Sequence, residues 1–185
     1  MTIRQIETGL MSPKQMDCVF LWLYCLDGLP YVKYLPLDAP RNMPMVLTLL
    51  RWDGRFGTMG GKVDPGESLR VALEREACEE ADFWLPGSTD VETLGTFADG
   101  DWHIHAFALE VSYAELVEAR AKASDARHAS PECAGWAIVP TGQYRDGENG
   151  ARGLEAFRKN HFASTAGLEF EALLAKIHER MSTEV

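Results

Sequence analysis

The chain has 185 residues, of which 46% are hydrophobic and 25% are charged, a composition typical of a soluble globular protein with a buried core. Its formal net charge of -10 argues against a broad basic surface for nucleic acid, although a local basic rim around an acidic site stays open. We therefore expect a single domain over residues 1–185, in which residues 1–15 form an N-terminal arm.

The N-terminal stretch lacks the long apolar segment of a signal peptide. The longest apolar run, Cys18–Leu26, has 9 residues, far fewer than the roughly 20 that a membrane-spanning helix needs. None of the four cysteines is spaced as Cys-x-x-Cys, so neither a zinc site nor a redox motif is indicated. We expect a cytoplasmic protein without a membrane segment.

In chain order, the first predicted element is a buried strand at 18–26, rich in aromatic and β-branched residues and followed by a turn signal at Asp27-Gly28. A second strand is predicted at 45–52, and a glycine-rich loop then leads into a helix at 68–81. The remaining predictions are strands at 91–97, 102–111 and 134–140, and helices at 112–122, 153–160 and 168–181.

Two of these helices carry clear local signals. Ser112 and Glu115 predict a capping box at the start of the second helix. The last helix has a predicted core-facing stripe formed by Leu168, Leu173, Leu174, Ile177 and Met181. Because strands and helices alternate irregularly, we predict an α/β or α+β fold with a mixed sheet and helices packed on it.

The helix at 68–81 gathers many carboxylates on an unexpected face. On a helical wheel that starts at Leu69 and advances about 100° per residue, Glu76 and Glu80 fall inside the apolar stripe and Glu79 falls at its edge. That stripe is defined by Ala72, Leu73, Ala77 and Ala81. A solvated acidic face, the alternative interpretation, would place the glutamates opposite these residues.

Carboxylates spaced at i, i+3 and i+4 repel one another, and the penalty grows when they are buried and unpaired. A divalent cation is the natural compensation, because Mg²⁺ binds carboxylate oxygens and bridges to substrate phosphates. Gly60 and Gly61 precede the helix and permit close approach of the backbone to a ligand. The pattern predicts a metal site for a phosphate-bearing substrate, with a structural carboxylate cluster as the alternative.

The segment 61–83 resembles the Nudix box, G-x5-E-x7-R-E-U-x-E-E-x-G-U, in which U is an apolar residue. The matching residues are Gly61, Glu67, Arg75, Glu76, Ala77, Glu79, Glu80 and Phe83. Asp82 stands where the family has glycine. Residues 45–175 are similar to the branch of the family that contains the snoRNA-decapping enzymes; there the loop usually reads Pro-Gly-Gly, and Met59 replaces the proline here.

The resemblance implies a Nudix-type α/β/α sandwich with a catalytic loop-helix-loop, and hydrolysis of a pyrophosphate linkage assisted by one to three Mg²⁺ or Mn²⁺ ions. The implied metal ligands are the side chains of Glu76, Glu79 and Glu80, together with the carbonyl of Gly60 or Gly61. Glu67 is implied to pair with Arg75, or to reach a metal through water. Glu132 matches a distal metal ligand of the family, and its alternative is a surface glutamate.

Further residues are candidates for substrate contact, each with a structural alternative. His105 matches a branch histidine near the site, but without the family it would be interpreted as a satisfied strand histidine. Arg51 and Arg55 match arginines of the branch, and one of them is a candidate for a bidentate phosphate contact. The alternative is a surface charge of a hairpin. Lys62 stands where an aromatic residue is common. The aromatic candidates for base stacking, which are otherwise core residues, are Trp52, Phe56 and Trp102.

The first functional expectation is removal of the 5′ cap from RNA, releasing a nucleoside diphosphate and a 5′-phosphorylated RNA. A basic cluster formed by Arg152, Arg158, Lys159 and His161 is a candidate RNA contact. Housecleaning hydrolysis of free nucleoside di- or triphosphates is the second expectation, and the acidic net charge favours it. A non-catalytic Nudix-fold binding module or an acidic scaffold are further alternatives. The branch implies a homodimer.

Overall fold

One long strand organises the sheet in the computed structural model, which describes residues 3–29, 42–85, 87–125, 132–145 and 151–183. This strand, β2 (Asp17–Gly28), confirms the prediction at 18–26. It also runs through Asp27 and Gly28, where the sequence indicates a turn. A β-bulge between Cys25 and Gly28 explains the difference, because it allows Gly28 to keep pairing with Met43.

Eight strands form one mixed sheet in the order β1-β6-β7-β2-β3-β4, with β5 paired to β2 and β8 paired to β3. β2 runs parallel to β7 and antiparallel to its other neighbours. A separate small sheet contains β9 (Gln143–Arg145) and β10 (Ala151–Gly153). The strands of the main sheet are β1 (Arg4–Ile6), β3 (Met43–Arg51), β4 (Phe56–Gly57), β5 (Met59–Lys62), β6 (Glu92–Asp99), β7 (Trp102–Glu110) and β8 (Cys133–Pro140).

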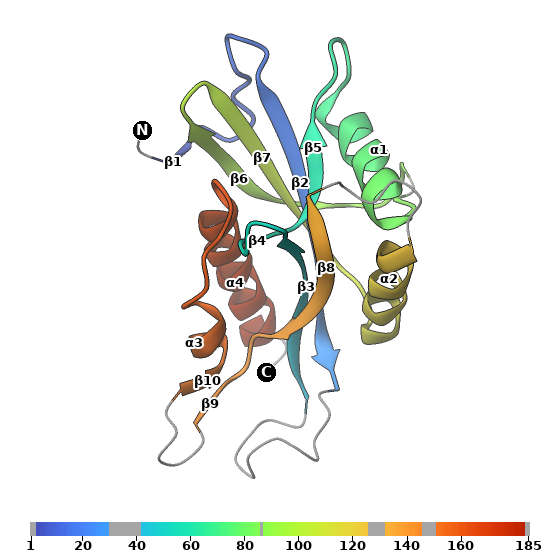
Figure 1. Ribbon diagram of the computed structural model, residues 1–185, viewed down its shortest axis with the longest axis vertical. Helices are drawn as coiled ribbons and strands as arrows, with labels where there is room; N and C mark the ends of the chain where they lie inside the picture. Colours follow the sequence, from blue (N-terminus) through green and yellow to red (C-terminus); the bar gives the residue numbers. More distant parts are fainter. Residues whose placement is uncertain (1–2, 30–41, 86, 126–131, 146–150, 184–185) are drawn as a thin grey trace.

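β5 and β3 share one edge of β2. Residues 18–21 of β2 pair with β5, and residues 24–28 pair with β3. Since β3 continues into pairings with β4 and β8, the sheet forks between β5 and β3 (Figure 1). The sequence suggests a loop at 59–62 because of its glycines. The segment is instead a strand, since each of its residues pairs with β2.

Helices cover both faces of the sheet, which confirms the predicted sandwich. α1 (Leu69–Ala81) and α2 (Tyr113–Asp125) lie on one side, and α3 (Leu154–Phe157) and α4 (Ala166–Thr183) lie on the other (Figure 1). Side chains of β2 alternate between two cores. Val19, Leu21 and Leu23 pack in the core under α1 and α2, whereas Trp22 and Tyr24 pack in the core under α4.

The capping box of α2 is confirmed, because the amide of Ser112 donates to the Glu115 carboxylate at 2.8 Å and the amide of Glu115 donates to the Ser112 hydroxyl at 3.3 Å. α3 is one turn long and shorter than predicted. It ends at Phe157, whose carbonyl accepts hydrogen bonds from the backbone and side-chain amides of Asn160. Within the described ranges, no helix is both long and apolar enough to cross a membrane.

The predicted stripe of α4 is partly wrong. Leu173 and Ile177 are buried, but Leu168 and Met181 are 41% and 47% exposed. The buried face is rotated toward Phe170, which lies on the side of the helix opposite Leu168. This rotation also brings a glutamate, Glu169, into the core.

α1 begins and ends at identifiable caps. The side-chain oxygen of Ser68 accepts a hydrogen bond from the amide of Val71, and the helix ends at Asp82. Asp82 has a φ of +47°, in the left-handed region that glycine adopts at least cost. The family's glycine at this position therefore has a clear backbone role, which aspartate fills with some strain.

Replacing Asp82 with glycine is expected to raise the free energy of unfolding by about 0.5 kcal/mol, because the relief of left-handed strain exceeds the added freedom of the unfolded chain. Asp82→Val should lower it, since a β-branched side chain is least compatible with this conformation. Urea unfolding followed by circular dichroism measures both changes. A glycine variant less stable than the wild type would contradict the strain assigned to Asp82.

Candidate active site

The carboxylate of Glu76 packs directly against the backbone of β5. Glu76 is 9% exposed, and a Cβ added to Gly61 would lie 2.7 Å from both of its carboxylate oxygens. Gly60, with a φ of +142°, is equally crowded, because its Cβ would lie 2.1 Å from the carbonyl oxygen of Val19. The two glycines thus permit α1 and β2 to close on β5 from two sides.

Arg75 neutralises much of the acidic helix. Its guanidinium binds both oxygens of Glu67, at 3.1 and 3.0 Å, and donates to Glu76 at 2.7 Å and to Glu79 at 3.3 Å. It also donates to the carbonyl of Lys62 at 2.9 Å. Pairing of Glu67 with Arg75, as the resemblance implies, is therefore present. Arg75 therefore carries part of the charge compensation for which the sequence analysis expects a divalent cation.

The carboxylates differ in environment as the helical wheel predicts. Glu76 is buried, Glu80 is half-buried, and the side chain of Glu79 is 50% exposed. Glu80 accepts a hydrogen bond from the amide of Gly60 at 2.9 Å, which brings it to β5. All three side chains carry carboxylate oxygens, the hard donors that Mg²⁺ and Mn²⁺ prefer. In the described part of the chain, no three His, Cys, Asp or Glu side chains are already drawn together around a metal position.

Burial and pairing shift the acidities of the site in opposite directions. Burial raises the pKa of Glu76, against the effect of Arg75. Hydrogen bonds from Arg75 lower the pKa of Glu67. Burial, reinforced by the charge of Glu76, raises the pKa of Cys18 to about 11, so this thiol on neighbouring β2 stays protonated at neutral pH and is no nucleophile.

A cavity of about 100 Å³ lies at the fork of the sheet, on the α4 side. Its walls include Phe20 of β2, Arg51 of β3, Thr58, Ser164 and Glu169. A larger groove of about 600 Å³ lies along α4 between Met43 and Met181, and no residue of the box lines it. No residue of the box lines the small cavity either. A third cavity, of about 390 Å³, does border the box, and its lining includes Lys62, Asp64 and Glu67 beside residues of the N-terminal arm.

Glu169 is a polar residue of this cavity that the sequence analysis missed. It is 1% exposed, and it accepts hydrogen bonds from Trp22 Nε1 at 2.9 Å and from the Thr165 hydroxyl at 2.5 Å. Burial raises its pKa. The same wheel that singles out Glu76 could have found it, since Glu169 precedes the buried Leu173 and Ile177 by one and two turns.

The candidate arginines are held in ion pairs at the turn after β3. Arg51 contacts the carboxylates of Glu132 and Asp53, and Arg55 donates to Asp53 at 3.0 and 2.7 Å. These bonds, chiefly those from Arg55, lower the pKa of Asp53. Arg51 nevertheless lines the cavity. Glu132, the candidate distal ligand, lies beside Arg51 at the start of β8.

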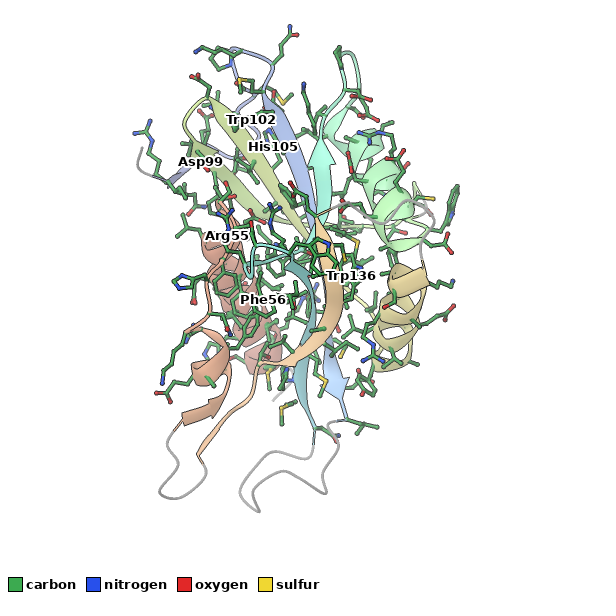
Figure 2. The ribbon with its side chains drawn as sticks, in the orientation of Figure 1. Arg55, Phe56, Asp99, Trp102, His105 and Trp136 are labelled. Atoms are coloured by element: carbon green, nitrogen blue, oxygen red, sulfur yellow. The ribbon has the colours of Figure 1, made fainter. Side chains whose placement is uncertain are left out.

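The three aromatic candidates have different environments. Phe56 packs edge-on against Phe157, with ring centroids 5.0 Å apart, inside an aromatic cluster, so it is a core residue (Figure 2). Trp52 is 76% exposed on the turn. Trp102, at the start of β7, is half-buried, and the amine of Lys62 lies 6.0 Å from its ring centroid.

His105 has the environment of the satisfied strand histidine that was its structural alternative, and its contact with substrate stays a prediction. It is 1% exposed, and its ring bridges Asp17 and Thr96 at 3.1 and 3.2 Å. Asp17 also accepts from the amide of Ser12, and Thr96 accepts from the amide of Gly9. His105 therefore fastens the N-terminal arm to the sheet, as a satisfied strand histidine.

The basic cluster near the end of the chain is only partly available. Both oxygens of Glu171 accept hydrogen bonds from Arg158, at 2.8 and 2.6 Å, which ties α3 to α4. The side chain of Arg152 lies outside the described residues.

Comparison with known proteins agrees with this geometry. The family model described as "Nudt16-like: U8 snoRNA-decapping enzyme-like" matches residues 18–180. A U8 snoRNA-decapping enzyme from Mus musculus is 32% identical over 153 residues, which span 78% of this chain and 76% of that protein. The chain belongs to the Nudt16-like family. The predicted Nudix resemblance, including its branch, is thereby confirmed.

Other relatives of this Nudt16-like protein fit the assignment. A U8 snoRNA-decapping enzyme from Homalodisca vitripennis is 35% identical over 111 residues; the match covers 57% of this chain and only 58% of that protein. A MutT/nudix family protein from Listeria innocua has a TM-score of 0.61 at 17% identity, over 90% of this chain and 96% of that chain. At this identity the structural match shows the Nudix fold alone.

Substitution of Gly61 by alanine is expected to lower pyrophosphate hydrolysis by about 100-fold, because the new Cβ must displace the Glu76 carboxylate by an ångström or more. Initial rates measure the loss, and circular dichroism checks that the variant folds. Gly135→Ala is the matched control, since a Cβ at Gly135 meets no atom within 4 Å. Equal losses in both variants would show that the Gly61–Glu76 contact is not the cause.

The depressed pKa of His105 predicts a pH-dependent stability. Burial lowers this pKa in the folded state, so protonation favours the unfolded chain. The stabilisation is present above pH 6.5, the ordinary histidine pKa, and is lost as the pH falls below it.

This loss is measured as the difference between the wild type and His105→Gln in urea unfolding at both pH values. The difference cancels Glu76 and Glu169, whose raised pKa values act with the opposite sign because the folded protein binds their protons first. If both proteins lost the same stability on acidification, His105 would not be the titrating group.

Proposed function

We propose that this chain is a divalent-metal-dependent hydrolase that cleaves the pyrophosphate linkage at the 5′ end of capped RNA. The observation that carries the proposal is the buried Glu76 carboxylate, held between Gly61 and Arg75, with Glu79 and Glu80 one helical turn further on. Membership in a family described as U8 snoRNA-decapping enzyme-like supports the choice of substrate. So does the U8 snoRNA-decapping activity in the name of the mouse relative.

Glu76, Glu79 and Glu80 would hold Mg²⁺ or Mn²⁺ together with a carbonyl of Gly60 or Gly61. When bound there, the ion neutralises charge on the phosphoryl group under attack. The chain's own contribution is positioning. Arg75 fixes Glu76 and Glu79 relative to β5, and the Gly60 amide fixes Glu80. A carboxylate of this group orients the attacking water, since Glu76 and Glu80 lie against β5.

The cavity at the fork, at about 100 Å³, can accept an edge of the cap's base but not the whole nucleoside. Phe20 forms one wall, and the buried carboxyl of Glu169 offers a polar edge that a base can recognise. Arg51 lies at the same cavity and carries a positive charge toward the phosphates. The base is thus assigned to the Phe20 and Glu169 walls of the cavity, and the phosphates to its Arg51 wall. The scissile linkage is assigned to the position next to β5.

Hydrolysis of free nucleoside di- or triphosphates is the second candidate. The observation that favours it is the net charge of -10, since long RNA contacts draw affinity from Lys and Arg. A non-catalytic binding module is disfavoured, because the box keeps Glu76, Glu79 and Glu80, and two of these carboxylates, those of Glu76 and Glu80, lie against β5. The homodimer and the cytoplasmic location implied earlier stay predictions, and light scattering on the purified protein tests the former.

Glu79→Gln and Glu80→Gln are each expected to lower kcat by about 100-fold or more, because each removes charge from the proposed metal site. Steady-state hydrolysis of a nucleoside diphosphate in Mg²⁺ or Mn²⁺ measures the effect, and chelation of the metal should abolish turnover. Glu74→Gln is the control on the same helix, since Glu74 pairs with Arg70 instead. Turnover like that of the wild type in both variants would refute the assignment.

Capped RNA is expected to be hydrolysed in preference to the free nucleotide, with a rate that falls as salt rises because phosphate contacts release counterions. Parallel measurement of both substrates over a potassium chloride series tests this. Equal specificity constants without salt dependence would favour the housecleaning candidate over decapping.

A further inference from the structure

Lys62 and Trp102 form a pair that the proposed chemistry does not yet use. The amine of Lys62 lies 6.0 Å from the centroid of the Trp102 ring, within the range of a cation–π contact. Lys62 is exposed and Trp102 is half-buried, so both keep surface available to a ligand. The amine of Lys62 forms no ion pair with another described residue. A lysine in this state is uncommon in a chain whose net charge is -10.

The pair lies on the same face of the sheet as the cavity at the fork. Lys62 is directly opposite Cys18 in the β2–β5 register, and opposite residues share a face. Phe20, two residues further along β2, points the same way and lines the cavity. Two residues of a strand span about 7 Å, so Cys18, beside the pair, is a neighbour of Phe20 at the wall of the cavity.

A hydrogen bond fastens the Trp102 end of the hairpin to the wall of the cavity. Asp99 is the register partner of Trp102 at the tip of the β6–β7 hairpin (Figure 2). Its carboxylate accepts a hydrogen bond from the hydroxyl of Ser164 at 2.7 Å, and Ser164 lines the cavity before α4. We call the exposed surface formed by Lys62 and Trp102 the shelf. The shelf and the cavity are therefore neighbouring parts of one surface.

We infer that Lys62 and Trp102 form a subsite for the first nucleotide of the RNA, on the far side of the pyrophosphate from the cap. Its base stacks on Trp102, and Lys62 pairs with its phosphate. The cavity at the fork is too small for a continuing chain, whereas the Lys62–Trp102 shelf is open to solvent and lets the RNA leave the protein. The inference deepens the proposed function and rests on it.

The test compares two substrates, a nucleoside diphosphate and the corresponding capped oligoribonucleotide. Only the second has a nucleotide that reaches the shelf. Trp102→Ala is expected to lower the ratio of kcat/KM for capped RNA to kcat/KM for the nucleoside diphosphate by about 10-fold or more, the usual size of one lost base–aromatic stack. Trp102→Phe, which keeps an aromatic face, should restore most of that ratio.

Trp84→Ala is the matched control, because Trp84 is 77% exposed beyond the end of α1, and the ratio should equal that of the wild type. Lys62→Gln provides a second measurement. Binding of the capped oligoribonucleotide over a potassium chloride series should show a log–log slope reduced by about 0.7, the value for one phosphate contact on a single strand.

A folded Trp102→Ala variant with an unchanged ratio overturns the subsite. If circular dichroism shows that this variant does not fold, the Lys62→Gln slope decides, and an unchanged slope overturns it. A wild-type protein that hydrolyses neither substrate refutes the proposed function itself, and the subsite falls with it. Failure of the subsite alone leaves the wild type active on both substrates.

Discussion

The guanidinium of Arg75 is the interaction on which the site depends. Two of its nitrogens donate to the two oxygens of Glu67. Its N–H groups also donate to Glu76, Glu79 and the carbonyl of Lys62. One cation therefore connects the loop before α1, the helix itself and β5. Removing it would leave several carboxylates close together, one of them buried, and the helix would lose its fixed distance from the strand.

The forked edge of β2 explains why the site lies where it does. A strand normally offers each edge to one neighbour, but β2 offers the same edge to β5 and then to β3. The divergence exposes a corner of the sheet on which α1 places carboxylates from one side and α4 places Glu169 from the other. Glu169 therefore borders the cavity at the fork on the α4 side, whereas Glu76 packs against β5 on the α1 side.

Much of the fold and of the candidate site was predictable from periodic patterns in the sequence, and the remainder depends on tertiary contacts. The acidic helix, the face that it buries and the central strands follow from local spacing, and the structure confirms them. The β5 strand escaped prediction because its glycines signal a loop, and only pairing with β2 makes it extended. The contacts of His105 were only partly predictable, because Thr96 is its partner across the adjacent β6–β7 hairpin but Asp17 is 88 residues away in sequence.

The close packing at Gly61 has a consequence for how this sequence can diverge. Any exchange at that position introduces a Cβ, and that atom would collide with the Glu76 carboxylate while the helix keeps its place. Relatives that retain hydrolysis should therefore keep glycine there even when the surrounding strand changes freely. Loss of this one glycine in a homologous gene would mark a lineage whose copy has abandoned catalysis before any of its glutamates has changed.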